Sequence, residues 1–131
     1  MPGLTRRGAG LAALGALARP RGAGAQATDW PTRPVRLMVP YPPGGPTDIL
    51  ARVVAQRLTV DLPQPVIVEN RGGANGTIGS EVVSRAAPDG TQFLMNASAH
   101  VIVPHLQRVP YDALADFVPV TNIAAVPLMP V

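Results

Sequence analysis

One stretch of eight residues limits what this chain can fold into more than any other. Residues 41–48 read Tyr-Pro-Pro-Gly-Gly-Pro-Thr-Asp, and three prolines with two glycines can continue neither a strand nor a helix. The stretch therefore predicts a loop. Thr47 is suited to the N-cap of a following helix, because its hydroxyl can accept a backbone N–H. Such a loop exposes a helix N-terminus, whose unpaired N–H groups and dipole attract anions. We therefore expect it to hold a carboxylate of a small solute.

The segments on either side of this loop predict a strand and a helix. Val35–Val39 is a short apolar run, and residues 48–62 have apolar side chains at helical spacing until Pro63 stops them. Residues 66–68 predict a second strand that is buried on both faces, because no polar residue alternates with its apolar ones. The positions expected to form the buried face of the helix are Ile49, Leu50, Val53, Val54 and Leu58.

A second glycine-rich loop repeats the pattern of the first. Residues 71–79 contain four glycines and lead to Thr77 or Ser80 as a helix cap, and residues 91–96 predict a third strand. The apolar positions at helical spacing in this second helix are Ile78, Val82, Val83 and Ala86. Alternating strands and helices predict parallel strands joined by right-handed crossovers. The three loops after the strands would then share one edge of the sheet, where open α/β sheets bind ligands.

The last part of the chain has a weaker pattern. Residues 97–108 predict at most a short helix because Pro104 interrupts them, Tyr111 with Asp112 predicts a surface turn, and residues 117–123 predict a fourth strand. A parallel sheet needs cover on both faces, and two helices scarcely provide it. We therefore expect an incomplete, truncated α/β domain.

The first 27 residues predict an export signal. An Arg6-Arg7 pair precedes a weakly apolar Gly/Ala/Leu segment, and residues 25–27 read Ala-Gln-Ala, an A-x-A cleavage pattern. The paired arginines are typical of the twin-arginine route. The sequence therefore predicts a signal peptide at 1–27, a periplasmic mature protein at 28–131, and no membrane span after cleavage.

Composition excludes several classes of function. All 11 basic residues are Arg, so a Schiff-base lysine and a Walker-type phosphate loop are excluded. Four of these arginines precede residue 28 while all eight acids follow it, so the basic pI belongs mostly to the leader. The absence of a basic stripe with aromatics argues against nucleic-acid binding. The absence of cysteine excludes thiolate metal sites and disulfides.

Several linked motifs resemble one family. The chain is similar, from Trp30 to its end, to the Bug proteins, the extracytoplasmic solute receptors of tripartite tricarboxylate transporters. The motifs that carry the resemblance are Trp30-Pro31 with Arg33-Pro34, the loop at 39–48, Val68-Glu69-Asn70-Arg71 with the loop at 73–79, Pro88-Asp89-Gly90, and Pro110-Tyr111-Asp112 with Asp116-Phe117. Two positions depart from the family pattern: Gly72 replaces a usual proline, and Pro63 replaces a usual glycine at the helix end.

The resemblance implies a periplasmic-binding-protein-like (type II) α/β fold, of which residues 28–131 are the N-terminal part of domain 1 and domain 2 is absent. It implies no catalysis, no metal and no cofactor, and it implies cognate membrane transporter subunits as partners. The solute would be a tricarboxylate, dicarboxylate, amino acid or aromatic acid. The residues expected to bind it are Tyr41, Pro43, Gly44, Gly45, Thr47, Asp48, Asn75, Gly76, Thr77, Asn96 and Ser98.

Simpler roles compete at several of these positions. Asp48 complements the helix dipole, and this structural role suits it better than contact with a carboxylate. Arg71 could clamp an anion, but an ion pair with Glu69 that shapes the loop is the favoured role. His100 and His105 are five residues apart with no acid close by, which does not favour a metal site. Ser98 with His100 lacks the surroundings of a nucleophile elbow.

Two other functions stay open on the sequence alone. Gly73, Gly76 and Gly79 superficially suggest a dinucleotide loop, which would make the chain part of a nucleotide- or phosphate-binding enzyme. The chain could also be a gene remnant with no function of its own.

Overall fold

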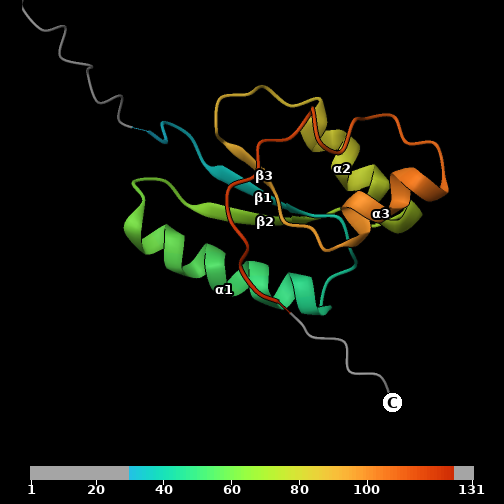
Figure 1. Cartoon of the computed structure of the whole chain (residues 1–131). Coiled ribbons are helices and arrows are strands. Elements are labelled where there is room, and N and C mark those ends of the chain that lie inside the picture. Colours follow the sequence, from blue (N-terminus) through green and yellow to red (C-terminus); the bar gives the residue numbers. More distant parts are fainter. Residues whose placement is uncertain (1–29, 126–131) are drawn as a thin grey trace, which may run out of the picture.

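A three-stranded parallel sheet lies between helices in the computed structural model, which describes residues 30–125 (Figure 1). The strands are β1 (Val35–Val39), β2 (Val66–Asn70) and β3 (Gln92–Leu94), in the order β2-β1-β3. Val39 lies opposite Asn70, and Met38 lies opposite Leu94. The predicted alternation of strands and helices, and the parallel pairing, are therefore confirmed.

The core forms around the central strand. Val35, Leu37 and Val39 belong to one buried apolar cluster, and Met38 is among the largest fully buried side chains. The prediction that the second strand is buried on both faces is wrong, because the Ile67 side chain in β2 is 45% exposed. The reason is the strand order: α1 packs on β1 and β2, whereas α2 packs on β1 and β3 and leaves one face of β2 open.

Helix α1 (Pro46–Asp61) begins earlier than expected. Pro46 occupies its first turn, where the missing N–H leaves no bond unmade, and the N-cap residue is Gly45. The prediction of Thr47 as the cap is wrong, since Thr47 already lies inside the first turn. At the other end Leu62 is extended and its N–H donates to the Leu58 carbonyl, so the helix ends before Pro63 without a left-handed residue.

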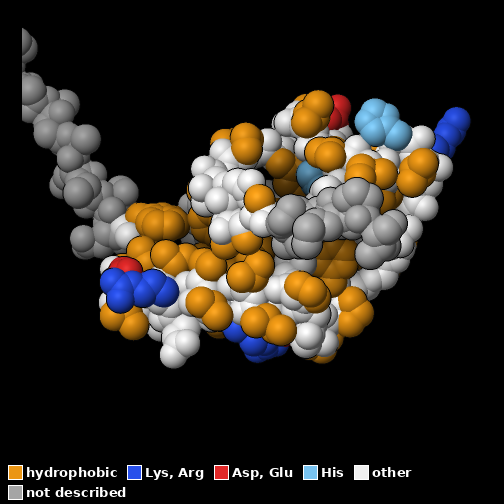
Figure 2. All heavy atoms as spheres, turned by 60° about the horizontal axis from the view of Figure 1, so that its bottom comes forward, with side chains coloured by type: hydrophobic (Ala, Val, Ile, Leu, Met, Phe, Trp, Pro, Cys, Tyr) orange, Lys and Arg blue, Asp and Glu red, His pale blue; other side chains and the backbone are white. Residues whose placement is uncertain are grey.

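The buried face of α1 also differs from the expected one. Ala51 and Ala55 are buried in the core, whereas Ile49 is 57% and Val53 61% exposed. Figure 2 brings the side of α1 forward and shows many apolar side chains on this surface. The small alanines let the helix axis approach the sheet, which turns Ile49 and Val53 outward, whereas Leu50 packs partly buried against the core as predicted.

Helix α2 (Thr77–Ser84) follows a single turn of 3₁₀ helix, η1 (Ala74–Gly76). Its N-cap residue is Gly76, so neither Thr77 nor Ser80 caps it as predicted. Its buried face consists of small residues, and Ile78, expected to be buried, is 49% exposed. A Cβ atom at Gly79 would lie only 2.8 Å from the Arg71 carbonyl oxygen, so glycine allows the close packing of α2 there.

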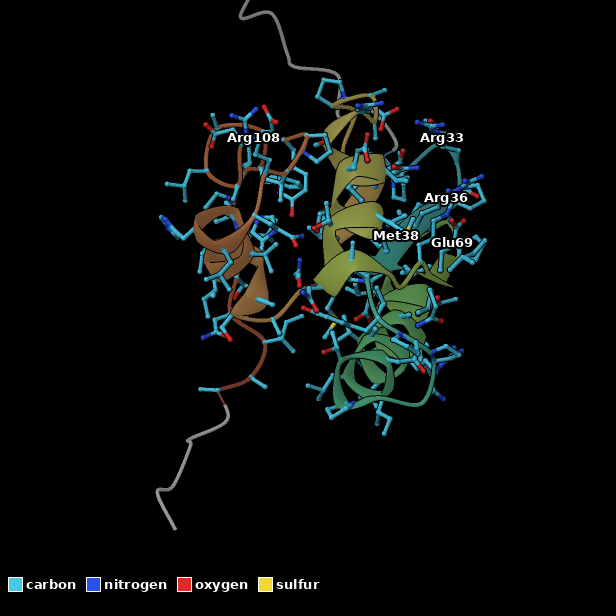
Figure 3. All side chains as sticks on the ribbon, turned by 90° about the vertical axis from the view of Figure 1, so that its right-hand side faces the viewer. Arg33, Arg36, Met38, Glu69 and Arg108 are labelled. Atoms are coloured by element: carbon cyan, nitrogen blue, oxygen red, sulfur yellow. The ribbon has the colours of Figure 1, made fainter. Side chains whose placement is uncertain are left out.

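The remaining described residues form one short helix and a long irregular segment. Helix α3 (Ala99–Leu106) contains Pro104 and packs against η1 and α2. Figure 3 shows α3 beside α2. The predicted fourth strand at 117–123 does not form, although Phe117 packs edge-on against Tyr111. Tyr111 is buried, so the prediction of a surface turn there is wrong for its side chain.

The predicted signal peptide at 1–27 lies outside the described residues. Among residues 30–125, none of the helices has both the length and the apolar character that crossing a membrane requires.

Candidate functional site

The loops that follow the three strands meet at one edge of the sheet. The Arg71 N–H donates to the Val39 carbonyl at 2.9 Å, and the Met95 N–H donates to the Met38 carbonyl at 2.8 Å. The second loop touches the first, since a Cβ atom at Gly72 would lie 3.3 Å from Pro42 and one at Gly76 3.5 Å from Pro40. The prediction that both glycine-rich loops lie on the same edge is confirmed.

An open pocket of about 490 Å³ lies at this edge, and we call it the edge pocket. One wall comes from the loop between β1 and α1, and the other comes from the loop between β3 and α3. The lining residues are Tyr41, Pro42, Pro43, Gly45, Pro46, Thr47, Ala97, Ser98 and Ala99. Five residues expected to bind ligand are therefore brought together here: Tyr41, Pro43, Gly45, Thr47 and Ser98.

Hydrogen-bond donors are concentrated at the start of α1. In the described part of the chain no hydrogen bond uses the N–H of Thr47, and the first intrahelical bond runs from the Ile49 N–H to the Gly45 carbonyl. Thr47 and Ser98 line the edge pocket from its two walls, and each carries a hydroxyl group. Three prolines and two alanines are among the remaining lining residues. The edge pocket thus offers a few donors on an otherwise apolar wall, a composition that suits a small anion.

The Asp48 carboxylate makes its hydrogen bonds with groups of the protein itself. Asp48 is 2% exposed, and its carboxylate accepts hydrogen bonds from the Gly44 N–H at 2.8 Å and from Arg52 Nε at 2.9 Å. The Asn70 amide donates to its other oxygen at 2.8 Å. The Arg52 side chain, the Gly44 N–H and the Asn70 amide lower the pKa of Asp48 to about 2. Asp48 therefore stabilises the loop, and the Gly44 N–H is already occupied.

Asn70 is the structurally important residue that the sequence reasoning missed. Its Nδ2 atom donates to the Tyr41 carbonyl at 3.2 Å as well as to Asp48, and its Oδ1 atom accepts from Arg52 at 3.3 Å. The available signal was its position, since a lone amide ends an apolar strand at the ligand edge of the sheet.

Glu69, the residue before Asn70, does not form the expected ion pair with Arg71. It forms an ion pair with Arg36 of β1 at 3.4 Å, and Figure 3 shows the two labelled side chains together. The two residues sit on neighbouring strands, so the sheet itself brings them together.

Asn96 lies behind the edge pocket and joins its two walls. Its Oδ1 atom accepts from the Tyr41 hydroxyl at 2.5 Å and from the Ala97 N–H at 2.8 Å. Its Nδ2 atom donates to the Ser80 hydroxyl at 3.2 Å. Burial raises the pKa of Tyr41, so its hydroxyl stays protonated and acts as the donor. Asn96 is not a lining residue.

The second glycine-rich loop does not line the edge pocket. Ala74 and Asn75 have φ angles of 46° and 56°, and Gly76 has a φ of 91°, so three successive residues are left-handed. Gly76 and Thr77 are buried, and the Thr77 hydroxyl accepts a hydrogen bond from Gln107 at 3.4 Å. This part of the predicted site packs under α3.

The two histidines have different contacts, although Tyr111 lies near both. His100 stacks on Tyr111 with ring centroids 5.9 Å apart, and it meets Phe117 edge-on at 4.7 Å. His105 lies in another hollow, with Tyr111 and Leu114. No group of three or more metal-ligating side chains occurs in residues 30–125.

Comparison with known proteins gives a consistent result. A family model described as tripartite tricarboxylate transporter family receptor matches residues 50–131. The protein BugT of Bordetella pertussis is 42% identical over 106 residues, which are 79% of this chain and 32% of BugT. The chain therefore spans about a third of the length of the curated relatives it matches.

Solved structures agree with this match. A TctC solute binding protein from Polaromonas is 39% identical with a TM-score of 0.57, over 61% of this chain and 28% of that protein. MatC from Rhodopseudomonas palustris with bound malate is 33% identical with a TM-score of 0.55, over 63% of this chain and 29% of MatC. The parallel α/β arrangement found here thus matches that of solved solute-binding proteins.

Proposed function

Because the chain belongs to the tripartite tricarboxylate transporter receptor family, a family of receptors rather than enzymes, we propose that it is part of a periplasmic receptor for a small carboxylate. Residues 28–131 would supply the N-terminal part of the first solute-binding domain, after export directed by residues 1–27. The receptor would deliver its solute to membrane subunits of a tripartite tricarboxylate-type transporter. Tricarboxylates, dicarboxylates, amino acids and aromatic acids are the candidate solutes.

The observation that carries this proposal is the edge pocket at the start of α1. A carboxylate in this pocket would meet the free Thr47 N–H and the positive end of a 16-residue helix. The Ser98 hydroxyl on the other wall is a second donor within the same pocket. Asp48 does not oppose the bound charge strongly, because Arg52 pairs with it at 2.9 Å. The relative MatC has malate bound, so malate is the first solute to test.

The glycine-rich loop at 73–79 weighs against the nucleotide-binding alternative. A Cβ atom at Gly73 would lie 2.6 Å from Ile78 Cδ1, and one at Gly79 would lie 2.8 Å from the Arg71 carbonyl. Gly79 is thus needed for packing within the protein, and Gly73, with a φ of 129°, for a backbone conformation that side chains rarely adopt. A phosphate loop instead needs glycines so that its backbone can approach a ligand.

Nuclear magnetic resonance of the isotope-labelled full chain tests the proposal. Malate should shift the backbone amide signals of Gly45, Thr47, Ser98 and Ala99 in a saturable way. Malamide, which has the same shape but amides in place of carboxylates, should not. Ser98→Ala should weaken malate binding, whereas Ser84→Ala, in the last turn of α2 and outside the edge pocket, is the matched control.

Two results would overturn the proposal. One is the absence of shifts with malate, citrate, aspartate and benzoate at millimolar concentration. The other is a set of shifts around residues 73–79 with ATP or NAD, which would revive the enzyme alternative.

A further inference from the structure

Asn96 has used all its hydrogen-bonding capacity inside the protein. Its oxygen accepts two bonds, from the Tyr41 hydroxyl and the Ala97 N–H, and its nitrogen donates two, to Ser80 and to His100. Tyr41 lines one wall of the edge pocket and Ala97 lines the other. A single amide therefore sets the position of both walls, although it does not line the pocket itself.

The hydrogen bonds of His100 define its protonation state. Its Nε2 atom lies 3.2 Å from the Ala113 carbonyl oxygen, which can only accept, so Nε2 carries the proton. Its Nδ1 atom lies 3.3 Å from Asn96 Nδ2, which can only donate, so Nδ1 must be bare. The orientation of the Asn96 amide is set independently, because the Ala97 N–H requires the oxygen on that side. The arrangement needs a neutral imidazole.

We propose that Asn96 is a positioning residue for the edge pocket and that protonation of His100 disrupts it, so that carboxylate binding weakens in mildly acidic solution. The proposal rests on the proposed function for its ligand, and it adds a regulatory input to that same site. Among side chains, histidine is the one that ordinarily changes charge near neutral pH.

The physical reason is a conflict between donors. A proton on His100 Nδ1 would face the Asn96 amide group, and two N–H groups cannot bond to each other. Turning the amide by 180° would satisfy His100 but would point the NH₂ group at the Ala97 N–H. Either way one bond in the network is lost, and the walls held by Tyr41 and Ala97 become free to separate.

Among residues 30–125, no charged side chain is paired with His100. The elements packed against α3 are η1, α2 and the segment 111–117. Their titratable groups are Glu81 and Arg85, which pair with each other, Tyr111, which stacks on the ring, and Asp112 and Asp116, which accept N–H groups of their own turn. Within the described residues none of these carboxylates forms an ion pair with His100.

The test compares the full chain with two matched variants. His100→Asn keeps an uncharged acceptor near the place of Nδ1 but cannot titrate there, and His105→Asn makes the same change at an exposed position of the same helix. Malate affinity is measured at about pH 7.5 and about pH 5.5, on either side of the usual histidine range. From the higher to the lower pH, the wild type and His105→Asn should lose about fivefold more malate affinity than His100→Asn. This factor corresponds to a modest coupling between two sites. Titration of malate itself affects all three proteins equally.

A second readout does not depend on any ligand. Over the same range of pH, the Ala97 amide and Tyr41 ring signals should shift in the wild type and in His105→Asn but stay constant in His100→Asn. Constant signals in the wild type would overturn the proposal even if malate binds, and so would an equal loss of affinity in all three proteins. Moving signals without malate binding would instead contradict the proposed function and leave the coupling established.

Discussion

The side-chain Nδ2 atom of Asn70 donates a hydrogen bond to the Asp48 carboxylate at 2.8 Å, which joins the end of β2 to the first turn of α1. The same nitrogen reaches the Tyr41 carbonyl at 3.2 Å. The loop rich in proline and glycine is thus fixed at its base by one buried carboxylate and one amide. This is how a segment with almost no side chains of its own can hold a defined shape beside the edge pocket.

The Asp48 carboxylate makes stability depend on pH. Its pKa is about 2 in the folded protein against an ordinary value of 3.8, so it stabilises the fold fully above the ordinary value. That contribution is lost as the pH falls from about 4 toward about 2, because the unfolded chain takes up the proton first. Urea unfolding should be measured between about pH 6 and about pH 2. As the pH falls, the free energy of unfolding should decrease more steeply for the wild type than for Asp48→Asn.

Arg52→Met is the control for this measurement. It keeps Asp48 but removes the partner that lowers its pKa most, so its fall in stability should lie between the other two. Asp89 and Asp112 also have lowered pKa values, but they contribute equally to all three curves. Identical curves for wild type and Asp48→Asn would show that the carboxylate has no such role.

Replacing Asn70 should loosen the loop. Asn70→Leu leaves the Tyr41 carbonyl and one Asp48 oxygen without their donor, which should lower the free energy of unfolding by about 1–3 kcal/mol. Asn122→Leu makes the same change at an exposed position and should stay within about 0.5 kcal/mol of wild type. Urea denaturation measures both. Equal stability of the two variants would mean that the amide is not needed.

Most of the sheet could be predicted from the sequence, for a definite reason. The apolar runs at Val35–Val39 and Val66–Asn70 are separated by a helical pattern, and a connection of that length requires parallel neighbours. Parallel strands end at one edge, so the common location of the two glycine-rich loops followed directly. The third strand was found too, although it is shorter than its apolar pattern suggested.

The side chains behind the site could not be predicted in the same way. Asn70 bonds to Asp48 across 22 positions, and Asn96 bonds to Tyr41 across 55. The place of Asn70 at the end of a strand marks it as a candidate, but nothing in the local pattern identifies the distant partners of either amide. Periodicity also failed for α1, because its alanines and its larger aliphatic residues form two competing apolar stripes. The choice between them depends on how closely the helix approaches the sheet.

The two stripes of α1 can be distinguished by mutation. Ala51 is 0% exposed, so Ala51→Leu should overpack the core and lower stability by about 1–3 kcal/mol. Val53 is 61% exposed, so Val53→Lys should change stability by no more than about 0.5 kcal/mol. Thermal unfolding of both variants measures the difference. A larger loss for Val53→Lys would mean that the helix is turned the other way.

The aromatic cluster on α3 should hold the irregular segment after it. Phe117 meets His100 at 4.7 Å and Tyr111 at 5.7 Å, both edge-on. Phe117→Ala should therefore cost about 2 kcal/mol, less than a fully buried phenylalanine because the side chain is partly exposed. Val118→Ala, at the exposed neighbour, is the control. Limited proteolysis should cut residues 107–125 faster in the first variant only, and equal rates would argue against this role.

The glycine at position 79 offers a test in which two effects have opposite signs. In an exposed helix, replacing glycine by alanine stabilises by about 1 kcal/mol. At Gly79 the new Cβ atom would lie 2.8 Å from both the Arg71 carbonyl oxygen and Pro40 Cβ, so α2 would have to move away from the sheet. Gly79→Ala should therefore destabilise by about 1–3 kcal/mol. Ser84→Ala, in the last turn of the same helix, should be neutral or slightly stabilising.

Because a shift of α2 would also move Ser80, which accepts a hydrogen bond from Asn96, the Gly79 variant should bind malate more weakly than Ser84→Ala. A gain in stability for Gly79→Ala would show that α2 is not packed this closely.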